Sequence, residues 1–163
     1  MPDKEEIELD IGFSYFGDPT LVEEYEVDAL THQRLPTKGK KVIGIDLQTV
    51  PEDIPIEQIK ASADYLPIQD QSVDSVFAGG VFGAYVDLED SVKEADRVLR
   101  PGGKMFIRTW GRYMPRLKLL LKRGYYITEM IAPEAEWHRQ YNPDENPLDF
   151  EWHVRAVKRG KRR

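Results

Sequence analysis

Short apolar runs alternate with amphipathic stretches along the chain, and this alternation predicts its secondary structure. Strands are expected where apolar and polar residues alternate or where a short β-branched run occurs. Helices are expected where apolar residues recur every three to four positions, as at 88, 92, 95, 98 and 99. The pattern predicts strands at residues 7–11, 41–47, 60–63, 73–78, 104–110, 125–131 and 150–157. It predicts helices at residues 21–30, 88–99 and 115–122, with a short one at 56–59.

The order of these elements predicts the fold class. Strands that alternate with helices favour an α/β fold, a doubly wound and mostly parallel sheet with helices on both faces. Residues 133–147, between the last two strands, are polar, contain three prolines and show no helical period. A parallel crossover normally uses a helix, so we expect these two strands to form an antiparallel C-terminal hairpin at the sheet edge. We expect one domain, residues 1–157, and a basic tail, 158–163.

Composition narrows the chemistry. The 163 residues include three histidines and no cysteine, which excludes disulfides, thiol nucleophiles and cysteine-based metal sites. The histidines lack metal-site spacing, so we expect no metal centre. The longest apolar runs are too short to span a membrane, and the acidic start is unlike a secretory signal. A cytoplasmic protein is therefore expected.

The net charge of −6 conceals an uneven distribution. Residues 1–96 carry 22 acids and seven bases, whereas residues 97–163 carry seven acids and 16 bases. Nine of these bases lie between residues 97 and 123, a segment without an acid. Such an asymmetry is typical either of solvated helix faces with a charged tail or of a surface that meets a polyanion such as RNA.

Candidate binding residues follow the predicted strands. In an open α/β sheet, ligands bind at the carboxyl ends of the strands. A carboxylate at the end of the second strand can accept two hydrogen bonds from a ribose diol, at about 1.5–3 kcal/mol each. The alternative is that it caps a helix or shapes a loop. The residues at these strand ends are Gly12, Asp46, Ser62, Ala63, Asp64 and Gly79.

Five segments resemble the class I S-adenosylmethionine-dependent methyltransferases of the small-molecule type, which have a Rossmann-like sheet. The segments are residues 8–12, 42–47, 62–68, 73–77 and 97–104, the last reading Arg-Val-Leu-Arg-Pro-Gly-Gly-Lys. The resemblance implies S-adenosylmethionine as cofactor and methyl transfer as activity. It implies that Asp46 binds the ribose hydroxyls, that Leu47 lies beside the adenine, and that the backbone of Ala63 contacts the adenine. It places Asp10 and Gly12 at the start of the family's glycine loop.

The chain departs from the family pattern at two places. Ser14 and Phe16 replace the second and third glycines of the loop, and a non-glycine residue in the left-handed region costs about 1–2 kcal/mol. Ser62 replaces the adenine-binding acid, and Asp64 lies close enough in sequence to substitute for it. No catalytic residue is assigned, since Tyr85 is the only titratable group just after the fourth strand.

Two functions remain open from the sequence. The first is an S-adenosylmethionine-dependent methyltransferase acting on a small molecule or RNA. The second is a cofactor-free methyltransferase-like scaffold, acting as a homodimer or as the partner subunit of another protein. RNA association through the basic segment is compatible with either. Residues 133–147 are the expected lid over a pocket that is otherwise open, because the chain begins almost directly on its first strand.

Overall fold

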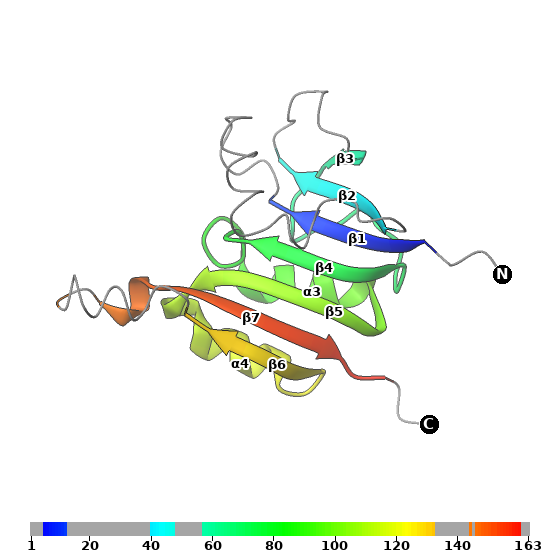
Figure 1. The fold of residues 1–163 in the computed structure, drawn as a ribbon. Helices are drawn as coiled ribbons and strands as arrows, with labels where there is room; N and C mark the ends of the chain where they lie inside the picture. The colour runs from blue at the N-terminus through cyan, green and yellow to red at the C-terminus, as the bar shows by residue number, and fades with distance from the viewer. Residues whose placement is uncertain (1–4, 13–39, 48–56, 133–143, 145, 161–163) are drawn as a thin grey trace.

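The computed structural model describes residues 5–12, 40–47, 57–132, 144 and 146–160. They form one seven-stranded sheet with strand order β3-β2-β1-β4-β5-β7-β6 (Figure 1). The strands are β1 Glu6–Ile11, β2 Lys40–Asp46, β3 Glu57–Lys60, β4 Val73–Gly79, β5 Leu99–Trp110, β6 Tyr125–Ile131 and β7 Glu151–Lys158.

Strand direction confirms the predicted mixed sheet. Strands β1 to β5 pair in parallel, whereas β7 runs antiparallel to both β5 and β6. The C-terminal hairpin therefore has β7 inserted beside β5 and leaves β6 at the edge of the sheet. Strand order reverses at β1 and β4, because β2 and β3 extend from one side of β1 and β4 from the other. This reversal is the place where an open α/β sheet binds its ligand.

Two helices within the described residues cover one face of the sheet. They are α3, Leu88–Val98, and α4, Met114–Leu121, which lie together behind β4 to β7 in Figure 1. The Asp87 carboxylate caps α3 by accepting hydrogen bonds from the amides of Glu89 and Asp90, at 2.9 and 3.0 Å. The helix predicted at 21–30, which would be needed to test for a second helical layer, lies outside the described residues.

The two faces of the sheet differ in chemistry, since successive side chains of a strand point to opposite faces. The face under the helices is apolar and fully buried, as Leu9, Val76 and Ile107 show with at most 1% exposure. The opposite face carries polar and aromatic side chains. There the Ser75 hydroxyl donates to Glu8 Oε2 at 3.1 Å, with Phe106 further along the sheet.

The structure corrects the prediction around the third strand. Residues 57–60 are not a helix, and the strand predicted at 60–63 is displaced to β3. Residues Glu57 to Lys60 instead extend the edge of the sheet by pairing in parallel with Ile43 to Asp46 of β2. Backbone pairing overrides a short local pattern that has few apolar residues.

The other observed element boundaries lie closer to the predicted ones. Strand β5 begins at Leu99 rather than at residue 104, because Leu99 pairs with Val73 before a bulge in the ladder. Strand β7 continues through Lys158, the first residue of the predicted tail, and Lys158 Nζ donates to the Leu99 carbonyl at 3.0 Å. In the part of the chain that the structure describes, no helix has the length and apolar character needed to cross a bilayer.

Candidate functional site

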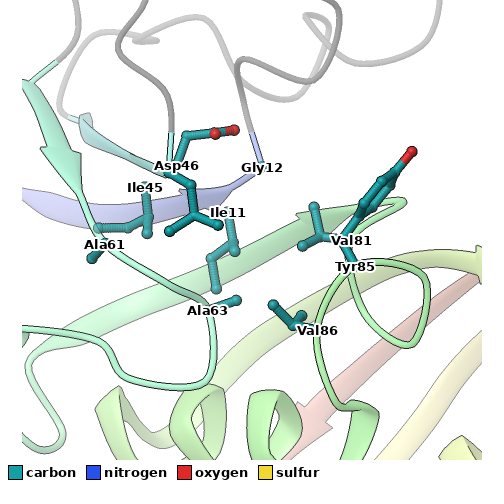
Figure 2. A pocket seen from close by; sticks show the side chains of 10 residues that line it. Ile11, Gly12, Ile45, Asp46, Ala61, Ala63, Val81, Tyr85 and Val86 are labelled. Atoms are coloured by element: carbon teal, nitrogen blue, oxygen red, sulfur yellow. The ribbon is translucent and has the colours of Figure 1, made fainter.

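A cavity of about 220 Å³ opens at the carboxyl ends of β1 and β2. Figure 2 shows Asp46 and Tyr85 on opposite rims, with the apolar side chains of Ile11, Ala63 and Val86 between and below them. The wall is otherwise formed by short and aliphatic residues. The full lining comprises Ile11, Gly12, Ile45, Asp46, Leu47, Ala61, Ala63, Val81, Tyr85 and Val86.

Gly12 brings the backbone close to the loop that follows β4. Its φ is +79°, and a Cβ built there would lie 2.0 Å from Val81 Cγ2. Its amide donates to the Ile45 carbonyl at 2.8 Å, which fixes the end of β1 against β2. Only glycine fits this position, both for its left-handed backbone and for the approach to Val81.

Asp46 and Leu47 form the rim above β2. The Asp46 carbonyl accepts a hydrogen bond from the Ala61 amide at 2.9 Å, so the end of β2 is held to the residue after β3. Leu47 is 58% exposed although it is apolar and lines the cavity. A carboxylate beside an exposed leucine at a cavity mouth suits a ligand with both hydroxyl groups and a flat apolar ring.

The segment that carries Ala63 is held to α3 by Arg97. The Arg97 guanidinium donates to the carbonyls of Leu66 and Ile68, each at 2.8 Å, and to Asp70 Oδ1 at 2.6 Å. It also forms two 2.8 Å bonds with Glu94, whose Oε2 accepts from the Leu66 amide at the same distance. These hydrogen bonds from Arg97 hold the pKa of Glu94 below its ordinary value and that of the guanidinium above its own.

The loop after β4 forms the other wall of the cavity. Phe82 is fully buried, and its carbonyl accepts from the Thr109 hydroxyl at 3.1 Å. The φ of Gly83 is +85°, and a Cβ there would approach the Tyr113 ring to 2.8 Å. The Tyr85 amide donates to the Val81 carbonyl at 3.1 Å. These contacts fix the backbone that presents Tyr85, which is 67% exposed at the cavity rim.

The structure separates the predicted site residues into two groups. Gly12, Asp46, Leu47 and Ala63 line the cavity. The others do not: Asp10 is buried within β1, Ser62 and Asp64 form the turn after β3, and Gly79 ends β4. Ser14, and Phe16 with it, lies outside the described residues.

The sequence interpretation missed part of the wall. Val81 and Val86 were not selected because nothing in their local pattern marks them as lining residues. Two glycines were the available signal. Gly12 marks the close approach of Val81, from the loop after β4, and Gly83 marks the close approach of Tyr113 to that same loop. Tyr85 was noted as a titratable group and now lies on the rim.

The basic segment is largely neutralised within the fold. Five of its arginines are paired with carboxylates, and each of the five has a partner outside its own helix or strand. Lys104, Lys118, Lys122 and Arg123 have no carboxylate partner among the residues that the structure describes. The pairs are Arg97 with Glu94 and Asp70, Arg100 with Asp74, Arg108 with Glu151, Arg112 with Asp149, and Arg116 with Glu89.

The strand order and the cavity together define a Rossmann-like protein with a ligand site at the carboxyl ends of its parallel strands. A family model described as a methyltransferase domain matches residues 28–107. The fold is that of the solved S-adenosylmethionine-dependent methyltransferases, as the resemblance predicted. The matched region contains Asp46, Leu47, Ala63 and Gly79, but begins after Asp10 and Gly12.

Solved structures agree over nearly the whole chain. A S-adenosylmethionine-dependent methyltransferase from Methanosarcina mazei is 19% identical, with a TM-score of 0.64 over 97% of this chain and 95% of that one. A methyltransferase from Haloferax volcanii, in complex with the Trm112 activator, is 16% identical, with a TM-score of 0.62 over 98% and 85%. At these identities the likeness establishes the fold.

Two curated relatives match shorter segments. A bifunctional biotin biosynthesis protein of Cellvibrio japonicus is 31% identical over 99 residues, which are 56% of this chain and 19% of that protein. A malonyl-[acyl-carrier protein] O-methyltransferase of Methylococcus capsulatus is 38% identical over 53 residues, 32% of this chain. The matches span about a fifth of each relative, 19% in both cases.

Proposed function

We propose that the protein is an S-adenosylmethionine-dependent methyltransferase. The observation that carries the proposal is the convergence of Gly12, Asp46, Leu47 and Ala63 on one cavity, since these four come from three different segments of the sequence. The resemblance assigns each of these four residues to the cofactor site.

The residues of the cavity fit the cofactor. The Asp46 carboxylate would accept hydrogen bonds from the ribose hydroxyls, and Leu47 and Ala63 would contact the adenine. At Gly12 the absent Cβ allows the backbone to approach a ligand closely. When bound, S-adenosylmethionine supplies a methyl group activated by a positively charged sulfur. The protein would supply position and orientation, which for an already ionised acceptor account for much of the rate.

Binding of S-adenosylhomocysteine, measured by calorimetry and by thermal shift, tests the proposal. Asp46→Asn removes a charged acceptor, and the loss of one charge-assisted hydrogen bond predicts a weakening of roughly 10- to 150-fold. Asp90→Asn is the matched control, because Asp90 lies on the exposed surface of α3, remote from the cavity lining. Wild-type protein that gives neither heat nor a melting shift with S-adenosylhomocysteine or S-adenosylmethionine at high concentration would refute the proposal.

Asp64→Asn addresses the altered adenine site separately. If Asp64 replaces the adenine-binding acid, this variant weakens S-adenosylhomocysteine binding although Asp64 does not line the described cavity. Unchanged affinity of Asp64→Asn for S-adenosylhomocysteine would indicate that Leu47 and Ala63 contact the adenine without Asp64.

We further propose that the sheet edge at β6 is a contact surface for a second copy of the chain or for a partner subunit. Tyr126, Ile127 and Ile131 are large apolar residues of this edge strand and are 61%, 37% and 44% exposed. Exposed apolar edge strands pair readily with other chains. The Haloferax volcanii neighbour, seen with its activator, gives a precedent for a methyltransferase of this fold with a partner. Light scattering that shows a monomer at all concentrations would count against self-association.

Three further expectations complete the proposal. One domain extends over residues 1–157, the protein acts in the cytoplasm, and RNA is a candidate acceptor or partner. The free basic residues that support RNA binding are fewer than the sequence suggested, because the five arginines named above are paired.

A further inference from the structure

Tyr85 is a large aromatic residue that is 67% exposed, although the loop that carries it is well fixed. The Gly83 amide donates to the Val86 carbonyl at 3.0 Å, and the Tyr85 amide donates to the Val81 carbonyl at 3.1 Å. The fully buried side chain of Phe82 anchors the loop in the core. An exposed ring on a fixed backbone can bind a ligand at a small cost in conformational entropy, because only its two side-chain torsions are ordered.

The described lining of the cavity offers one charged group and one aromatic ring. Of the ten described lining residues, Asp46 alone carries a charge and Tyr85 alone is aromatic, and the others are aliphatic residues or glycine. Figure 2 shows Tyr85 across the cavity from Asp46 and beside Val81, with its hydroxyl directed away from Asp46. The part of Tyr85 that adjoins the cavity is therefore its ring rather than its oxygen.

The strand order indicates which end of the cofactor would meet this ring. Ala63 follows β3, Asp46 ends β2, and Tyr85 follows β4 on the far side of β1. In S-adenosylmethionine the adenine and the sulfur are attached at opposite ends of the ribose. A cofactor with its adenine at Ala63 and its ribose at Asp46 would therefore direct its sulfur toward β1 and β4. This sulfur carries a full positive charge, and the described lining on that side contains no carboxylate.

We propose that the ring of Tyr85 binds the positively charged sulfonium group of the methyl donor, so that the site prefers S-adenosylmethionine to its demethylated product. The inference rests on the proposed function, because it concerns the same cofactor cavity. The face of an aromatic ring is negative and attracts a cation that lies over it. The sulfur of S-adenosylhomocysteine is neutral, so this attraction ends when the methyl group has been transferred. The contact therefore favours binding of the donor and release of the product.

The first test compares the dissociation constants of S-adenosylmethionine and S-adenosylhomocysteine by calorimetry, and it needs no acceptor. Tyr85→Leu keeps an apolar side chain but removes the ring, and it is expected to weaken binding of S-adenosylmethionine roughly 3- to 30-fold more than binding of S-adenosylhomocysteine. Tyr85→Phe keeps the ring face and is expected to leave the ratio of the two constants within about twofold of the wild-type value. Tyr65→Leu is the matched control, because Tyr65 is 79% exposed and lies outside the cavity lining, and it is expected to change neither constant.

The second test reports the position of the ring directly. It uses NMR of bound S-adenosylmethionine labelled with carbon-13 at the carbons bonded to sulfur. Protons that lie over the face of an aromatic ring resonate upfield of their position in the free ligand, because the ring current opposes the applied field. This upfield shift is expected with the wild-type protein, Tyr85→Phe and Tyr65→Leu, and it is expected to be largely lost in Tyr85→Leu.

Several results overturn the inference and leave the proposed function intact. Tyr85→Leu that weakens both ligands equally, or neither, shows that the ring only covers the cavity or contacts another molecule. A ratio altered as much in Tyr85→Phe as in Tyr85→Leu assigns the effect to the hydroxyl instead of the ring. Proton resonances that Tyr85→Leu does not move place the sulfur away from the ring. Wild-type protein that binds neither ligand refutes the proposed function and the inference together, so the two failures are distinguishable.

Discussion

Replacing Arg97 by methionine is expected to loosen the segment that forms one wall of the cavity. The methionine side chain retains much of the apolar stem of arginine but donates no hydrogen bonds. The carbonyls of Leu66 and Ile68 each lose a 2.8 Å bond from a charged donor, and Glu94 loses its bidentate partner. The predicted consequences are a less stable protein and a weaker cofactor site, because Ala63 lies only three residues before Leu66.

The size of the effect follows from these contacts. Two hydrogen bonds from a charged group to backbone carbonyls, at about 1.5 kcal/mol each, give about 3 kcal/mol. The ion pair with Asp70 adds little, since that carboxylate is largely exposed. In a protein of this size about 3 kcal/mol corresponds to a fall in Tm of about 6–12 °C.

Arg100→Met is the matched control for Arg97→Met. Arg100 is similarly half-buried and paired with Asp74 at 2.6 Å, but its one backbone bond, to the Gln71 carbonyl, is long at 3.2 Å. We expect a smaller loss of stability, about 1.5 kcal/mol, and no change in cofactor affinity.

The assay combines denaturant unfolding with calorimetry of S-adenosylhomocysteine binding, at a temperature where all three proteins are folded. Arg97→Met is expected to weaken binding at least several-fold relative to both wild type and Arg100→Met. Equal destabilisation by the two substitutions, or unchanged affinity in Arg97→Met, would show that Arg97 does not hold the cavity wall.

Three further outcomes follow from the structure. Gly12→Ala is expected to cost at least about 2 kcal/mol in unfolding free energy, because it adds left-handed strain and a clash with Val81; urea denaturation measures it. Tyr125→Phe is expected to lower Tm by about 2–4 °C, since it removes the 2.7 Å hydrogen bond to Asp96; calorimetric scanning checks it. Hydrogen bonding from Arg97 lowers the pKa of Glu94 below 4.5. The ionised Glu94 carboxylate should therefore stabilise the folded protein fully above pH 4.5, and this stabilisation should disappear as the pH falls through the lowered pKa. The difference in stability between wild type and Glu94→Gln, measured from about pH 6 to about pH 3, should therefore shrink with acidification; a difference that grows would contradict this.

Elements with strong local patterns were predictable from the sequence. Strand β6, Tyr125–Ile131, was located to the residue, and its antiparallel pairing followed from the lack of a helix before β7. Gly12 and Asp46 could be placed at the site because both follow apolar strand patterns directly. Strand β3 could not be located from the sequence, because its four residues derive their conformation from pairing with β2.

Contacts between distant segments were beyond sequence reasoning. The pairing of Arg108 with Glu151 joins residues 43 positions apart, and that of Arg97 with Asp70 joins residues 27 apart. The local sequence around His153 assigns it no role, since nothing in its neighbourhood along the chain indicates Arg108 or Phe106. The strand order brings them together, and the order depends on the whole sheet.

The pairing of arginines with carboxylates also contributes an electrostatic attraction between the two halves of the chain. The acidic first 96 residues and the basic remainder, with net charges of −15 and +9, are each strongly self-repelling when separated. In the fold they meet along the seam between β4 and β5, where Arg97 and Arg100 bind carboxylates of the first half. The two halves therefore act as oppositely charged complements. A polypeptide divided after Asp96, near the end of α3, would form two fragments whose reassociation is driven by charge as well as by apolar burial, and is weakened by salt.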